Sequence, residues 1–393
     1  MPDTSLGQEL CALVLGMDWL YRSRPRPPGE ATLAGEGLVP VDLWRGQPLP
    51  LAAWSAAIEA VDALRARLAE VSDPVRRAFL EDTLLSLETT ARWQRGDPLP
   101  FRARASRLLG LDVAPVGDLP CLRSRVADGL AARGYVGSVG EAARCWEADR
   151  ALPADRLERT ARRLLAEARE RTEAQLKPLP GRPLMGVALA HGVPWTGYCD
   201  YEAGLMRLNA DQPFAPERLK LLVLHEGYPG HEYHLAWREA DVRAGRLPAD
   251  AALVITNTPS SPLFEGIGDN GGPFLDWLDA DEHLGLALST LRSAACVNAC
   301  LMLHEDDRSP EETRAFLVEE GAAQRTWADV RVRFMLDPLR SPFVFSYYLG
   351  YRAVADAAAA WRGERSAFFA CLLGQMHSPR SLRLAVARED PGQ

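Results

Sequence analysis

Helical periodicity constrains this chain of 393 residues more than any other feature. In two stretches of the first half, apolar residues recur every three or four positions, which places them on one face of an α-helix. They are Ile58, Val61, Leu64, Leu68 and Val71 in the first stretch, and Leu157, Ala161, Leu164, Leu165 and Ala168 in the second. The sequence therefore predicts a mostly α protein, in which amphipathic helices pack on a core.

One region, residues 181–210, has a different sequence pattern. Short apolar or alternating runs at 184–190 and 204–209 are bounded by Gly, Pro and Asp. Such runs predict a small β hairpin or two paired strands. Beyond this region the periodicity predicts further helices, which we place at about 216–226, 231–244, 273–303, 310–321 and 343–373.

Composition excludes some classes of partner. Lys and Arg number 45 against 53 Asp and Glu, so the formal net charge is −8 and no global basic field attracts nucleic acid. No run reaches the roughly 18 apolar residues that a membrane span needs, and the first residues do not resemble a signal peptide. The seven cysteines include no CxxC pair, which is typical of a reducing compartment. We therefore predict a cytoplasmic protein without nucleic-acid or membrane partners.

The candidate chemistry lies in the stretch from His225 to His234. Three of the seven histidines fall within these ten residues, next to Glu226 and Glu232 and directly after an apolar run. Imidazole and carboxylate ligands suit Zn²⁺, and a glutamate beside the first histidine can take a proton from metal-bound water. The alternative interpretation is that these histidines only cap or pack two helices.

The spacing of these histidines requires a break in the helix. His225 and His231 are six residues apart, which on a regular helix rotates one by about 240° from the other. Pro229 and Gly230 supply a bend, because proline interrupts the helix and glycine allows conformations closed to other residues. Such a bend brings His231 back beside His225, whereas without it the local pair is His231 and His234.

Several segments resemble one known family. His225-Glu226-x-x-Pro229-Gly230-His231 resembles the H-E-x-x-P-G-H signature of the bacterial proteins grouped as domain of unknown function 885. Phe264-Glu265-Gly266 resembles the E-G-W-A element of that family. Two later segments resemble its L-H … W-S-x-E-x and S-Y-K-x-G segments, namely Leu303-His304 with Ser309-Pro310-Glu311-Glu312, and Ser346-Tyr347-Tyr348-Leu349-Gly350. The resemblance covers about residues 180–355.

The resemblance implies a fold and a domain organisation. The family is regarded as zinc metallopeptidase-like and related to the helical peptidases of the thimet oligopeptidase and Taq carboxypeptidase type. It implies a helical two-lobed metallopeptidase-like fold, with a small β hairpin or sheet beside the active-site cleft. Residues 1–180 are then an N-terminal helical region and 181–393 the metal-binding catalytic region, unless the chain is one continuous elongated domain.

The resemblance also implies a ligand set. His225, His231 and Glu265 would hold one Zn²⁺ per chain, with Glu226 as the general base. From spacing alone three downstream acids compete with Glu265 for the third position, and they are Asp269, Asp276 and Asp279. Asp269 lies one helical turn beyond Glu265 and can instead orient a ligand histidine or remain a solvated acid.

Hydrolysis of an amide needs a further donor for the developing oxyanion. Tyr347 is the first choice through its match to S-Y-K-x-G, and His304 is the second catalytic candidate. The other residues considered for this role are Tyr348, Tyr351 and Arg340.

The predicted function is zinc-dependent hydrolysis of a peptide or amide bond in a short peptide or amino-acid-derived substrate. Arg340 or Arg352 can clamp a substrate carboxylate, and His191, Tyr198 and Arg207 lie where an extended peptide can dock on a strand edge.

Two alternatives stay open. The chain has Ile267-Gly268-Asp269-Asn270 where the family has W-A and an aromatic residue, and His234 where the family usually has Gln. These departures motivate a metal-dependent enzyme acting on a specialised small molecule in a biosynthetic pathway. The second alternative is a non-catalytic helical binding protein with a relic site.

Overall fold

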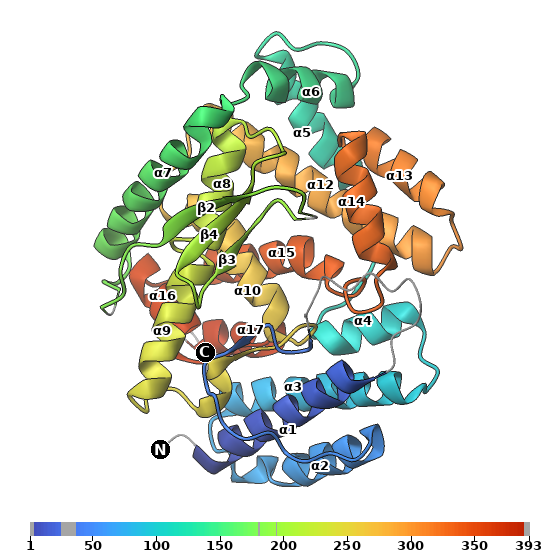
Figure 1. Cartoon of the computed structure of the whole chain (residues 1–393), viewed down its shortest axis with the longest axis vertical. Helices are drawn as coiled ribbons and strands as arrows, with labels where there is room; N and C mark the ends of the chain where they lie inside the picture. The colour runs from blue at the N-terminus through green and yellow to red at the C-terminus, as the bar shows by residue number, and fades with distance from the viewer. Residues whose placement is uncertain (1–3, 25–36, 180, 194, 389–393) are drawn as a thin grey trace. The chain divides into compact units, whose positions relative to one another are not determined.

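The computed structural model describes residues 4–24, 37–179, 181–193 and 195–388. Over these ranges the chain is mostly helical, with one sheet of three strands and one of two strands (Figure 1). This confirms the predicted fold class of a mostly α protein with a small β element. The chain divides into two compact units, and each unit is assembled from separate stretches of sequence.

The first unit comprises Met1–Val113, Trp237–Leu263 and Asp337–Gln393. Its helices are α1 (Thr4–Ser23), α2 (Trp54–Ala66), α3 (Pro74–Arg95), α4 (Phe101–Leu109), α15 (Val344–Ala360), α16 (Arg365–Gly374) and α17 (Pro379–Arg388), with 3-10 turns η1 (Leu68–Glu70) and η2 (Ala249–Ala252). The strands β1 (Val41–Asp42) and β5 (Leu253–Val254) pair antiparallel. Helices α1, α2 and α3 lie side by side (Figure 1), and the predicted apolar stripe from Ile58 to Val71 is buried in their core.

The second unit comprises Ala114–Ala236 and Phe264–Leu336. Its helices are α5 (Leu119–Ala131), α6 (Val139–Asp149), α7 (Ala154–Gln175), α8 (Pro216–Glu226), α11 (Gly271–Phe274), α12 (Ala280–His304), α13 (Pro310–Glu319) and α14 (Arg325–Leu336). Two more helices, α9 (His231–Arg243) and α10 (Ser260–Asp269), begin in one unit and end in the other. The second predicted stripe, on α7, is buried as expected.

This division differs from the predicted boundary after residue 180. The first unit joins sequence from both ends of the chain, and the second unit continues through position 180. Pro180 itself lies outside the described residues. The linear pattern of helices does not reveal such a division, because it contains no information on which helices return to pack on α1, α2 and α3.

A three-stranded sheet stands where one pair of strands was predicted. Its strands are β2 (Gly186–Ala190), β3 (Gly197–Asp200) and β4 (Leu205–Asn209), in the spatial order β2-β4-β3. The two predicted runs do pair, but as parallel strands, and the antiparallel hairpin is formed by β3 and β4. Parallel neighbours require a crossover, which the segment containing β3 supplies. The sheet lies beside α7 and α8 (Figure 1).

Two long helices predicted from periodicity are each interrupted. The predicted helix 273–303 is α11 followed by α12, because the Asp279 side chain accepts hydrogen bonds from Asp281 and Glu282 and starts a new helix in a capping box. The predicted helix 343–373 is α15 followed by α16, because Trp361 adopts an extended conformation at the end of α15. Apolar periodicity continues through both interruptions, so it could not reveal them.

Helix α12 is, within the described ranges, the one helix long and apolar enough to cross a membrane by length and composition. Half of its apolar window is buried inside the fold, and the helix packs against α5, α8 and α13. A buried helix at the centre of a helical unit meets the same criteria of length and composition, so these contacts favour a core helix.

Candidate metal centre

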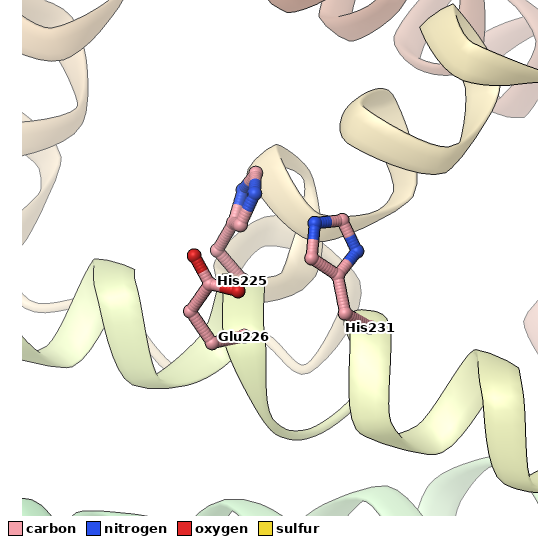
Figure 2. A group of neighbouring side chains, drawn as sticks. All are labelled: His225, Glu226 and His231. Atoms are coloured by element: carbon pink, nitrogen blue, oxygen red, sulfur yellow. The ribbon is translucent and has the colours of Figure 1, made fainter. Parts of the chain in front are cut away.

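The chain breaks between the two histidines of the signature. Helix α8 ends at Glu226, helix α9 begins at His231, and the connection contains a cis peptide bond between Tyr228 and Pro229. Figure 2 shows the two imidazoles projecting from opposite sides of this break. The predicted irregularity at Pro229-Gly230 is therefore confirmed.

Gly230 is the residue that makes this connection sterically possible. A Cβ at this position would lie 1.8 Å from the backbone oxygen of His225 and 2.5 Å from that of Leu224. The backbone N–H of Gly230 instead donates to the Leu224 oxygen at 3.0 Å. A side chain at position 230 would push α9 away from the last turn of α8, so the approach of His231 to His225 depends on glycine.

The break brings three potential ligands together. The ligand atoms of His225, Glu226 and His231 all lie within 4.8 Å of one another, which makes them a metal-competent group within the described part of the chain. The rings of His225 and His231 are 4.5 Å apart between centroids and nearly perpendicular, at 72°. Residues six apart in sequence therefore become neighbours.

Glu265 of α10 contacts both imidazoles. Its Oε2 lies 3.2 Å from Nε2 of His225, and its Oε1 lies 3.7 Å from Nε2 of His231. Of the rival acids, Asp279 is used as the N-cap of α12. Glu226 competes with Glu265 as a third ligand, but Glu265 is the carboxylate that lies against both Nε2 atoms. The structure thus brings His225, His231 and Glu265 together with Glu226.

Asp269 fixes the orientation of His225. Its Oδ1 lies 2.9 Å from Nδ1 of His225, which directs Nε2 of the same ring toward Glu265. Gly268 lets the ring approach, since a Cβ there would lie 2.8 Å from Nδ1. A carboxylate behind the imidazole is the usual way of orienting a histidine ligand and raising its basicity. Two of the residues that depart from the family pattern therefore lie directly against His225.

His231 is held by an aromatic ring instead. Phe264 stacks on it with centroids 4.0 Å apart and planes 2° from parallel. Nδ1 of His231 is buried and has no hydrogen-bond partner among the described residues. His234, the alternative partner predicted for His231, is also buried and lies near the same Phe264 ring, with centroids 5.3 Å apart.

The charges of the group suit a cation. Burial, with repulsion from His225 and His234, lowers the pKa of His231 well below its usual value, so this imidazole is neutral. Burial also lowers the pKa of His225, but Asp269 and Glu265 outweigh it and raise this pKa well above its usual value. Two imidazoles with adjacent carboxylates are a donor set that zinc favours. The residues present therefore fit a zinc ion.

Glu226 is held by the edge of the sheet. The backbone N–H of Cys199 in β3 donates to its Oε2 at 2.9 Å, a contact that the sequence did not predict. Burial raises the pKa of Glu226 to about 7, while the positive charge of His225 opposes the shift and Glu265 adds to it. A carboxylate with a pKa near neutrality and one oxygen already fixed is suited to accept a proton.

The other predicted site residues belong to the first unit or have partners of their own. Tyr347 and Tyr348 are on α15 in the first unit, and Arg340 belongs to the same unit. His304 ends α12, and its Nε2 lies 2.8 Å from the backbone oxygen of Met335. The catalytic roles of Tyr347 and His304 stay predictions.

The residues proposed to contact a docked peptide are engaged on and around the sheet. His191 pairs with Asp211 at 2.7 Å and Arg207 with Asp200 at 2.7 Å, while Tyr198 packs edge-on against Trp195. Their contact with substrate stays a prediction.

Comparisons with known proteins relate this chain to others through its fold. No family model and no curated protein matches the sequence. A solved structure from Colwellia psychrerythraea, described as a "putative lipoprotein", has a TM-score of 0.60 and 16% identity, covering 85% of this chain and 69% of that one. A "putative lipoprotein of unknown function" from Shewanella oneidensis has a TM-score of 0.54 and 15% identity, covering 84% of this chain and 71% of that one. These likenesses establish a shared fold.

Proposed function

We propose that this protein is a zinc-dependent hydrolase that cleaves a peptide or amide bond in short or amino-acid-derived substrates. The observation that carries the proposal is that His225, Glu226 and His231 form a metal-competent group, with Glu265 in contact with both imidazoles. The resemblance to domain of unknown function 885 supports the same proposal, and we propose membership of that family.

The proposed chemistry divides the residues by role. His225, His231 and Glu265 would hold the zinc ion, which when bound polarises a carbonyl and acidifies water. Glu226 accepts the proton on Oε1, because Oε2 is already hydrogen-bonded to Cys199. Asp269 keeps His225 in the orientation that ligation needs. Tyr347 is proposed to donate to the oxyanion, with His304 as the second candidate.

A mixed peptide library with a mass-spectrometric readout tests this function. We expect the zinc-loaded protein to cleave short peptides and the Glu226→Gln variant to retain zinc but lose turnover by about 10²- to 10⁴-fold, since an amide cannot accept the proton. Full activity in Glu226→Gln would mean that another group is the base. No cleavage of any peptide by zinc-loaded protein would instead favour the biosynthetic alternative.

Whether α12 spans a membrane is a separate question. The names of the two similar structures do not support the predicted cytoplasmic location, since both are described as lipoproteins. The contacts of α12 favour a core helix, so we propose that it does not span a membrane. Fractionation of cells that produce this chain tests the proposal, because a membrane-spanning helix would resist extraction with alkaline carbonate.

A further inference from the structure

Arg218 lies on α8 two turns before the metal-competent group. The half-buried residues of this helix are Pro216, Arg218, Leu221, Leu222 and His225, and its other residues are buried. Four of them, from Arg218 to His225, follow the spacing i, i+3, i+4, i+7, which places them along one face. Arg218 and His225 therefore lie on the same side of α8, separated by about 10 Å along its axis.

The hydrogen-bond partners of the Arg218 guanidinium group are neutral. Its guanidinium group donates to neutral oxygens: Gln212 Oε1 at 3.1 Å, and Thr196 Oγ1 and the Pro213 carbonyl at 3.4 Å. Among the described residues, no carboxylate oxygen pairs with it. An Arg with long, neutral hydrogen bonds retains donors for a planar anion.

The carboxylate that attracts Arg218 electrostatically, Glu147, is paired with another Arg. Glu147 of α6 accepts two hydrogen bonds from Arg292 of α12, at 2.7 and 2.9 Å, and both of these side chains are largely buried. Burial lowers the pKa of Arg218 to about 10. Repulsion from Arg292 and Arg331 adds to this shift, and attraction to Glu147 opposes it. Glu147 is therefore hydrogen-bonded to Arg292 and not to Arg218.

Strand β3 connects this cation to the catalytic end of α8. Thr196, which precedes the strand, contacts Arg218, and Cys199 within it donates to Glu226. The strand thus follows α8 from one feature to the other, and the distance between them matches about three residues of extended chain.

We propose that Arg218 binds the carboxylate of the substrate, so that the protein acts on short peptides with a free C-terminus and cleaves about three residues before it. This inference rests on the proposed function for the position of the bond that is cleaved. The binding of the carboxylate depends on Arg218 alone and replaces Arg340 and Arg352 as the predicted clamp. A guanidinium fork and a carboxylate form two parallel charge-assisted hydrogen bonds.

Calorimetric titration with tri-alanine and with its C-terminal amide tests the inference. The full-length Glu226→Gln variant is used with and without zinc, so that the probes stay intact. We expect the acid to bind about tenfold more tightly than the amide, because the amide lacks the charge that Arg218 pairs with. In Arg218→Gln the two probes should bind equally. The control is Arg163→Gln, since Arg163 forms an exposed pair with Glu167 on α7 and should leave the preference unchanged.

Arg218→Lys is the second variant. It keeps the charge and loses the planar fork, so we expect an intermediate preference for the acid. Equal binding of acid and amide before Arg218 is changed would overturn the inference. A preference that stays at its full value in Arg218→Gln, or in Arg218→Lys if the first variant does not fold, would also overturn it.

The two proposals can fail separately. Acid preference without hydrolysis of any peptide would keep the carboxylate site and remove the hydrolase. Hydrolysis without acid preference would keep the hydrolase and remove the carboxylate site.

Discussion

Two buried histidine sites in this molecule differ in what surrounds them. His377, in the first unit, has Nε2 3.0 Å from the Cys371 carbonyl and Nδ1 3.4 Å from the Ser381 hydroxyl. In the second unit, the ring nitrogens of His225 face Glu265 and Asp269, and His231 has one nitrogen without a protein partner. Each site contains a buried histidine, His377 in the first and His231 in the second. The adjacent carboxylates are what distinguish a candidate metal centre from a structural histidine.

The largest effect that sharpens this comparison is the acid sensitivity of His377. Burial lowers its pKa from 6.5 to about 4, so its neutral form stabilises the folded state fully above pH 6.5. As the pH falls from 6.5 toward 4, the unfolded chain binds a proton that the folded protein excludes. The contribution of His377 to the free energy of unfolding should therefore decrease by about 3 kcal/mol over this pH range.

Denaturant titrations at several pH values measure this effect. His377→Gln removes the titrating group, so other acids cancel in the difference between the original protein and the variant. Equal losses of stability in both proteins would show that burial does not lower the pKa of His377. His377 would then no longer serve as the structural histidine of this comparison.

A smaller effect is expected from Asp269→Asn. The amide keeps the shape of the side chain but not its charge, so the orientation and basicity of His225 weaken. We expect zinc affinity to fall by about 10- to 100-fold, which a competition titration with a chromogenic chelator measures. Asp279→Asn is the matched control, because Asp279 caps α12 and its substitution should leave zinc affinity unchanged. Equal zinc affinities in Asp269→Asn and the unmodified protein would show that Asp269 does not support the binding of zinc by His225.

The sequence predicted the mostly α fold class, several of the helices and a set of candidate site residues, but not all of their surroundings. Periodicity identified α8 and α9, and the Pro-Gly pair located the break between them, because both signals are local. The backbone donor of Cys199 and the stacking of Phe264 on His231 could not be predicted, since each joins segments distant in the chain. Gly268 offered a weak signal, as a small residue one turn from a ligand candidate.

The same distinction explains where the fold differs in detail from the prediction. The capping box at Asp279 is a local signal in the sequence Asp279-Ala280-Asp281-Glu282. The apolar pattern on both sides of it nevertheless favoured a single continuous helix. The parallel pairing of β2 with β4 was not readable, because strand order depends on the path of the chain between them.

The metal content of the purified protein tests the central claim most directly. Elemental analysis after chelator-free purification and dialysis against zinc should give about one zinc per chain for the unmodified protein. His225→Ala should give essentially none, because the remaining ligands hold the ion too weakly, whereas His377→Gln should retain the full content. No zinc in the unmodified protein, or an unchanged content in His225→Ala, would contradict the assignment of this group as a metal centre.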